Sequence, residues 1–117
     1  MFIEEKTQVE KRRFRRARFS DAISYRLKDV NHFGGCLGCD ISEGGVRIQF
    51  NDFVPINTEM VLQMKLSNIP KVIDVTGRVV WLQQVPYSDR YQIGLQFTKA
   101  DPIYHEEIRS YVKTHPS

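Results

Sequence analysis

An alternation of apolar and polar residues with a period of two dominates the chain from Ser20 onward. It is clearest in four runs, at residues 23–27, 46–50, 60–66 and 91–97. Such alternation is typical of strands that bury one face and expose the other. No helical pattern lies between the runs, although parallel strands would need helical crossovers. The sequence therefore predicts an antiparallel sheet that closes into a barrel or sandwich.

Two further segments extend this pattern. Residues 72–82 form a longer run that we expect to begin half-exposed and to become buried, because residues 79–82 are apolar on both faces. A short strand is expected between Gly35 and Ile41, after a turn at residues 31–35, and another turn is expected at residues 43–45. The total is about six strands.

The period changes near the end of the chain. Asp101 can cap a helix, and Pro102 suits its first turn. Four apolar residues then recur at helical spacing on one stripe: Tyr104, Ile108, Tyr111 and Val112. The expected fold is mainly all-β, a six-stranded antiparallel barrel at about residues 20–98 with a C-terminal helix at about residues 102–114.

Length and composition limit the remaining possibilities. A chain of 117 residues that is 41% hydrophobic can form one small core, and residues 10–117 are expected to be a single domain behind a flexible leader at residues 1–9. No stretch approaches the roughly 18 apolar residues of a membrane span. Acidic residues follow Met1 where a secretory signal would carry basic ones, so a cytoplasmic protein is expected.

Positive charge is concentrated in one segment. The formal net charge is +3, but residues 11–18 hold six of the 17 basic residues. The remaining 11 basic and 14 acidic residues leave the rest of the chain at −3. We expect an anionic partner to bind near residues 11–18, which we call the arginine arm.

Guanidinium groups suit a compact anion that carries both bases and phosphates, since they pair with phosphate and with guanine O6 and N7. Ordering seven residues costs about 7–14 kcal/mol of backbone entropy. A hydrogen bond to a charged group returns about 1.5–3 kcal/mol, so only a ligand that engages several arginines would fix the arm. We therefore expect an arm that is mobile when free and ordered when bound. Taken alone, the run is more typical of a solvated basic tail, or of a nonspecific arm for nucleic acid or membrane surfaces.

A short polar motif lies between two strand patterns, at residues 40–45. The Asp40 carboxylate can accept the N1–H and N2–H₂ edge of guanine, and the Ser42 hydroxyl can assist. Gly45 supplies a positive φ or lets a ligand approach the backbone. The alternative is a turn in which Asp40 or Ser42 stabilises its own hairpin.

Together these elements resemble the PilZ domain family, whose members are small bacterial receptor domains for cyclic di-GMP. The resemblance covers about residues 10–113 and includes stretches at residues 77–81 and 91–97. The Arg-x-x-x-Arg motif is matched by Arg12 and Arg16, and the Asp/Asn-x-Ser-x-x-Gly motif by Asp40, Ser42 and Gly45.

The resemblance implies a six-stranded barrel, often with a C-terminal helix, and a set of ligand contacts. Arg12 and Arg16 would hold guanine and phosphate, Asp40 and Ser42 would bind a guanine edge, and Gly45 would shape the turn. Additional contacts could come from Lys11, Arg13 and Trp81, although a tryptophan in a strand more often belongs to the core. Lys11 precedes the first motif arginine and leaves open whether one dinucleotide or a stacked pair binds.

Other chemistry has little support in the sequence. Cys36 and Cys39 could form half a zinc site or a redox pair, but two small residues of a buried strand fit them better, and no metal site or cofactor is expected. No catalytic residues are identified, so an enzyme is not expected. The expected function is cyclic di-GMP reception in bacterial second-messenger signalling, by a monomer or weak dimer with an unidentified downstream protein partner. The rivals are a nucleotide-independent interaction adaptor and a nonspecific nucleic-acid-binding arm.

Overall fold

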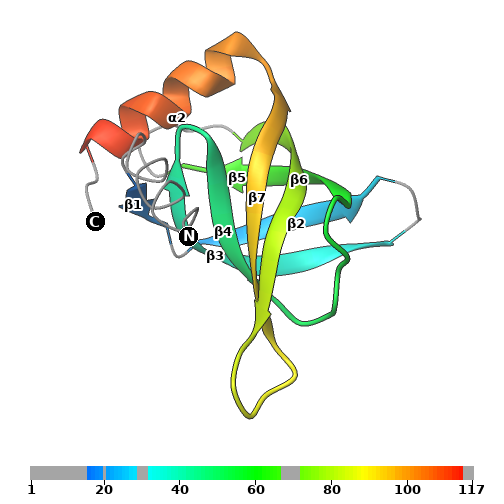
Figure 1. Ribbon diagram of the computed structural model, residues 1–117. Coiled ribbons are helices and arrows are strands. Elements are labelled where there is room, and N and C mark those ends of the chain that lie inside the picture. The colour runs from blue at the N-terminus through cyan, green and yellow to red at the C-terminus, as the bar shows by residue number, and fades with distance from the viewer. Residues whose placement is uncertain (1–15, 20, 29–31, 67–71, 115–117) are drawn as a thin grey trace, which may run out of the picture.

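The computed structural model describes residues 16–19, 21–28, 32–66 and 72–114. Figure 1 shows strands that wrap around a common core, with one helix lying across an end of the barrel. In chain order the elements are β1 (Arg16–Arg18), β2 (Ala22–Leu27), β3 (His32–Ser42), β4 (Gly45–Phe50), β5 (Glu59–Lys65), β6 (Val72–Gln84), β7 (Tyr91–Ala100) and α2 (Pro102–Thr114).

All strand pairings within the described residues are antiparallel. The sheet order is β1-β3-β2-β5-β6-β7-β4, and an additional β3–β4 pairing closes β2 to β7 into a barrel. The predicted six-stranded antiparallel barrel is therefore confirmed. β1 is a seventh strand, which pairs with the C-terminal end of β3.

β1 corrects one expectation about the arginine arm. Arg16, Ala17 and Arg18 lie opposite Ser42, Ile41 and Asp40, and the Phe19 N–H donates to the Cys39 carbonyl at 3.0 Å. Ala17 and Phe19 are buried, so their apolar side chains fix this segment to the barrel. The last residues of the predicted arm thus form a strand of the sheet.

The core matches the faces that the alternation predicts. Ile23 and Tyr25 of β2 are buried, as are Ile93 and Leu95 of β7. The predicted inward residues of β4 and the β5 region are also buried: Val46, Ile48, Phe50, Met60, Leu62, Met64 and Leu66. Burying this set stabilises the barrel and leaves the alternate positions of each strand facing outward.

The helix begins as its sequence predicts. The Ile103 N–H donates to the Asp101 carboxylate at 3.0 Å, and Pro102 is the first helical residue. Its buried residues are Ile108, Tyr111 and Val112. No helix among the described residues is long and apolar enough to cross a membrane.

The turn expected at residues 31–35 is wrong for residues 32–35, because β3 begins at His32. Gly34 pairs with Tyr25, and a Cβ at Gly34 would lie 3.3 Å from the Tyr25 hydroxyl oxygen. The two glycines that suggested a turn instead belong to the strand, where Gly34 leaves room for the Tyr25 ring.

The expected burial of residues 79–82 is also wrong. Val79 is buried, but Val80 and Trp81 are 43% and 38% exposed. A bulge in the pairing with β7 lies between Val79 and Trp81, and it changes which side chains face the core. Beyond it, β6 and β7 continue as the long hairpin at the bottom of Figure 1.

Candidate functional site

Asp40 and Arg16 meet on the outer surface of the barrel. The β1–β3 register places Arg16 opposite Ser42, which makes Asp40 its diagonal neighbour on the same face. The Arg16 Nε donates to Asp40 Oδ1 at 2.7 Å, and its Nη2 lies 2.5 Å from the same oxygen. The Asp40 side chain is 13% exposed, whereas that of Arg16 is 42% exposed. The structure therefore joins one residue from each predicted motif.

Arg47 of β4 is a third member of this cluster, and the sequence analysis did not identify it. It lies directly opposite Asp40 in the β3–β4 pair, and its Nη2 donates to Asp40 Oδ2. The signal for it was available, because outward-facing residues of β4 alternate with the buried ones and Arg47 is the charged one among them. Both oxygens of Asp40 are thus paired with arginine.

Ser42 stabilises its own turn in this structure. The residue is 2% exposed, and its hydroxyl donates to the Gly45 carbonyl and accepts from the Gly44 N–H, both at 3.3 Å. Glu43 and Gly44 form the connection between β3 and β4. This is the turn-stabilising alternative that the sequence left open, and a contact between Ser42 and a ligand stays a prediction.

Gly45 is required by the approach of two strands. The described glycines include none with a positive φ, so the positive-φ explanation is wrong. A Cβ at Gly45 would lie 2.1 Å from the Leu95 carbonyl oxygen of β7. The absent side chain therefore leaves room for the backbone of β7 beside the turn.

Trp81 lies on the outer surface rather than in the core. A Cβ at Gly94 would be 2.2 Å from the Trp81 Nε1, so the indole lies over Gly94. Gly94 pairs with Trp81 on one side and with Arg47 on the other, and Arg47 pairs with Asp40. Asp40, Arg47, Gly94 and Trp81 therefore form one row across four strands, which we call the outer row. Three strand spacings give it a width of about 14 Å.

Helix α2 contacts both segments that flank Asp40. Arg109 forms an ion pair with Glu43 in the β3–β4 turn, and its Nη1 donates to Glu106 at 2.6 Å. The hydrogen bond to Glu43 and the charge of Glu106 raise the pKa of Arg109 above its ordinary value.

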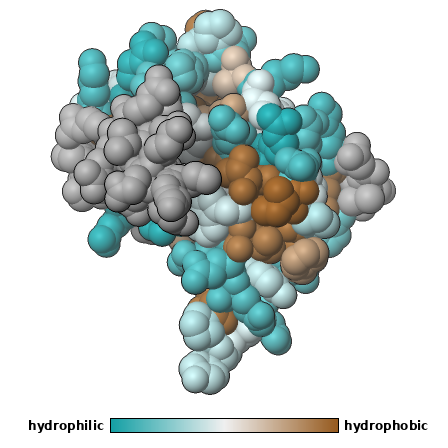
Figure 2. Space-filling view, viewed as in Figure 1, coloured by the Kyte–Doolittle hydropathy of each residue, from teal (hydrophilic) through white to brown (hydrophobic). Residues whose placement is uncertain are grey.

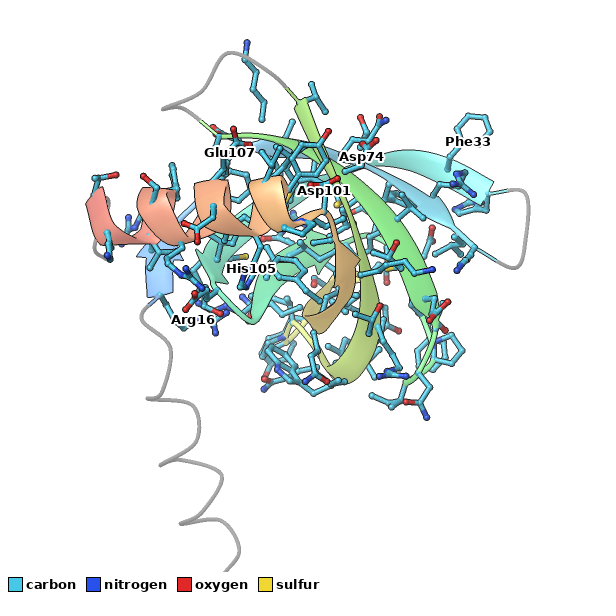
Figure 3. All side chains as sticks on the ribbon, turned by 90° about the horizontal axis from the view of Figure 1, so that it is seen from above. Arg16, Phe33, Asp74, Asp101, His105 and Glu107 are labelled. Carbon is cyan, nitrogen blue, oxygen red and sulfur yellow. The ribbon has the colours of Figure 1, made fainter. Side chains whose placement is uncertain are left out.

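The second contact of α2 is with β1. The Tyr111 hydroxyl donates to the Arg18 carbonyl at 3.1 Å, and the Tyr111 ring packs edge-on against Phe19 with centroids 5.9 Å apart. Figure 3 shows Arg16 on the side of the molecule where β1 lies beside the helix.

Lys11, Arg12 and Arg13 lie outside the described residues, so the predicted roles of these three stay predictions.

Cys36 and Cys39 lie on β3 with half-buried, free thiols. Burial raises the pKa of Cys36 to about 12, with a smaller contribution from Cys39. Within the described ranges, no three His, Cys, Asp or Glu side chains gather as a metal site would require.

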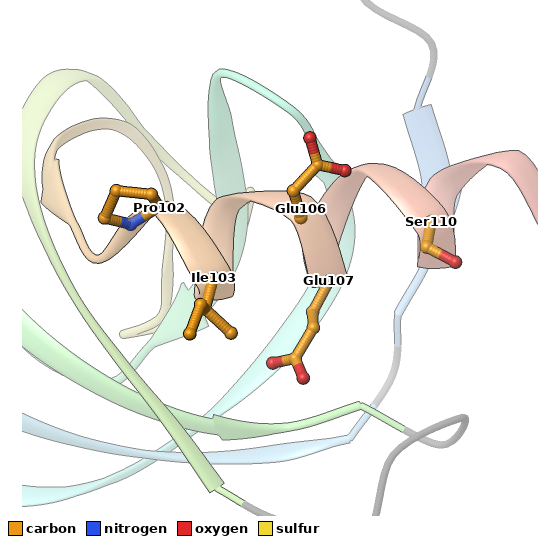
Figure 4. Close-up of a pocket in the computed structure, with 5 residues that line it drawn as sticks. All are labelled: Pro102, Ile103, Glu106, Glu107 and Ser110. Carbon is orange, nitrogen blue, oxygen red and sulfur yellow. The ribbon is translucent and has the colours of Figure 1, made fainter.

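Two other surface features lie apart from the Asp40 cluster. A cavity of about 490 Å³ on the outer side of α2 is lined by Pro102, Ile103, Glu106, Glu107 and Ser110 (Figure 4). Figure 2 shows an apolar area over β6 and the β4–β5 connection, where Phe53, Ile56 and Val80 are exposed. Neither feature includes Asp40 or its two arginines.

Solved structures of known proteins share this fold. Bacillus subtilis MotI/DgrA, an inhibitor of motility, gives a TM-score of 0.69 at 12% identity, over 86% of this chain and 49% of that one. The K. pneumonia MrkH–c-di-GMP complex gives 0.70 at 19% identity, over 86% of this chain and 50% of that one. The chain therefore spans about half the length of these two proteins. The PilZ domain of Escherichia coli YcgR with c-di-GMP gives 0.66 at 10% identity, over 90% and 91%.

No curated protein matches this chain. The PilZ domain model, in contrast, matches residues 10–114, which is nearly the whole chain. The match agrees with the closed antiparallel barrel and the C-terminal helix. On this evidence, the chain belongs to the PilZ domain family.

Proposed function

We propose that this domain is a receptor for cyclic di-GMP in bacterial second-messenger signalling. The observation that carries the proposal is the Asp40 carboxylate, which lies on the outer face of the barrel between two arginines and in the same row as Trp81. Guanine presents two adjacent N–H donors that match a carboxylate, and the phosphates of the dinucleotide match guanidinium groups. MrkH and the PilZ domain of YcgR, which share the fold, are complexes with c-di-GMP.

In this proposal Asp40 binds the Watson–Crick edge of one guanine. Arg16 and Arg12 bind phosphate and the other guanine edge, with Lys11 and Arg13 as additional cations. Ser42 and Gly45 maintain the turn that presents Asp40. Trp81 offers a planar, partly exposed ring on which a base can stack, at a strength of about 1–3 kcal/mol.

The proposed domain limits follow the expected ones. Residues 10–117 act as one binding domain with the arm at residues 11–18, and residues 1–9 are a leader. The role is binding rather than catalysis, since PilZ domains are regulatory binding domains. A downstream protein would detect the changed surface, and we place this signalling in the cytoplasm.

Calorimetric titration with cyclic di-GMP tests the proposal and gives the stoichiometry. Trp81 is the only tryptophan in the chain, so its fluorescence offers an independent signal for a base that stacks on it. Cyclic di-AMP is the matched control ligand, because adenine carries no N1–H for Asp40. Absence of binding at about tens of micromolar cyclic di-GMP would refute the receptor role.

Asp40→Ala tests the contact itself, because it removes both carboxylate oxygens. We expect an affinity loss of about 10–100-fold, since a hydrogen bond to a charged group contributes about 1.5–3 kcal/mol. Asp74→Ala is the matched control, as Asp74 is an exposed carboxylate of β6 that pairs across the sheet with Gln63 (Figure 3). Equal affinities of the two variants would contradict the proposed contact.

A further inference from the structure

Arg47 belongs to neither recognised motif, yet it shares Asp40 with Arg16. The two arginines approach different oxygens of the carboxylate. Arg16 directs Nε and Nη2 at Oδ1, whereas Arg47 directs Nη2 at Oδ2. This division determines how Asp40 can accept a guanine.

A count of acceptor sites shows which contact must change. Each carboxylate oxygen can accept two N–H donors. The two nitrogens of Arg16 fill Oδ1, and the single contact of Arg47 leaves one site on Oδ2. A guanine edge brings one donor to each oxygen, so Arg16 has to give up at least one contact with Oδ1. Arg47 can keep its contact with Oδ2 throughout.

The two arginines are also anchored differently. Arg47 lies in the middle of β4, which is paired with β3 on one side and with β7 on the other. The Arg47 Nε is buried and has no hydrogen-bond partner among the residues that the structure describes. Arg16 lies in a strand of three residues that pairs only with β3 within the described part of the chain. Arg16 is therefore suited to exchange partners, and Arg47 to stay.

We infer that Arg47 is a positioning residue for guanine recognition: it holds Asp40 through Oδ2 while Arg16 transfers from Oδ1 to the ligand. The inference rests on the proposed function. Without Arg47, the carboxylate is free to turn both oxygens toward Arg16 and to form a bidentate pair, the strongest geometry for these two groups. That pair would compete directly with the guanine edge.

The test measures guanine preference as well as affinity. Cyclic di-IMP carries hypoxanthine, which lacks the 2-amino group and so offers Asp40 one donor fewer. The native protein should prefer cyclic di-GMP over cyclic di-IMP by about tenfold or more. Arg47→Gln should reduce this ratio toward one, and Arg47→Lys should give an intermediate ratio, because an ammonium group can still donate to Oδ2.

Arg26→Gln is the matched control. Arg26 is an exposed arginine of β2 that pairs with Phe33, seven residues along β3 from Asp40, so its loss should leave both affinity and preference unchanged. Urea unfolding of each variant would identify a purely structural effect, which would lower the folded fraction without changing the ratio of the two affinities.

The outcomes separate the inference from the function on which it rests. If the native protein does not bind cyclic di-GMP, the proposed function is wrong. If it binds with guanine preference and Arg47→Gln keeps that preference, the inference is wrong and the function stands. If Arg47→Gln does not fold, Arg47→Lys decides, because a ratio equal to the native one would overturn the inference.

Discussion

Replacing Gly45 with alanine tests whether this glycine is required by the fold or by the ligand. The new Cβ would lie 2.1 Å from the Leu95 carbonyl oxygen, whereas real Cβ contacts are essentially never under 3.0 Å. The turn and β7 would therefore have to separate by at least about 0.9 Å. The adjacent hydrogen bond from the Phe97 N–H to the Gly44 carbonyl, now 2.9 Å, would lengthen to about 3.8 Å and be lost.

These two effects set the expected size of the change. Overpacking at a well-packed position costs about 1–3 kcal/mol, and a lost backbone hydrogen bond about 0.5–1.5 kcal/mol. We therefore expect Gly45→Ala to lower the free energy of unfolding by about 2–4 kcal/mol. For a chain of this size, that corresponds to a fall in Tm of about 8–16 °C.

Urea unfolding followed by circular dichroism measures this difference. Gly35→Ala is the matched control, because the nearest atom to a Cβ at Gly35 is the Ile23 carbonyl oxygen at 3.8 Å. Its unfolding free energy should stay within about 1 kcal/mol of the native value. If Gly45→Ala is as stable as Gly35→Ala, the strand approach does not explain the motif glycine, and a role in ligand contact alone becomes the better account.

Two further substitutions and the titration of Cys36 have definite expected results. Gly94→Ala should displace the Trp81 indole, shift its fluorescence and weaken cyclic di-GMP binding, and it should lower the free energy of unfolding by about 1–3 kcal/mol because the indole loses its packing on Gly94. Tyr111→Phe should cost about 0.5–1.5 kcal/mol in urea unfolding through loss of the bond to the Arg18 carbonyl. The pKa of Cys36, raised from 9.0 to about 12, should slow its alkylation at pH 8 by about a thousandfold relative to the unfolded chain, as site-resolved mass spectrometry can measure. The same shift should lower stability as pH rises from about 9 to 12, because the unfolded chain releases the Cys36 proton first.

Alternation in the sequence predicted the barrel because each strand buries one face. The expected burial at the end of β6 depended instead on the continuous apolar run at residues 79–82, and it was wrong. A single extra residue between Val79 and Trp81 turns Trp81 outward, where strict alternation from Val79 would place it inward. Periodicity alone contains no signal for such a bulge. The position of Trp81 over Gly94 depends on it, and therefore required the structure.

The site was predictable in part for a related reason. Asp40 and Ser42 are two residues apart in a strand and share a face, so the motif itself places them together. The partnership of Asp40 with Arg47 depends on the register of the β3–β4 hairpin, which its two-residue connection at residues 43–44 determines. The contact of Arg16 with Asp40 depends on β1, a strand of three residues within a segment whose composition suggested a flexible arm.

The register that makes the site also links it to helix α2. Glu43, the partner of Arg109, lies in the turn that follows Asp40 and Ser42. Arg18, whose carbonyl accepts from Tyr111, lies directly opposite Asp40. Any ligand that draws Arg16 away from Asp40 acts on β1, and thus on a strand that the helix contacts directly. Coupling between two sites is reciprocal. A partner that binds α2 and loosens its contacts with β1 or with Glu43 would therefore change the affinity for the ligand by the same factor by which the ligand changes the affinity for that partner.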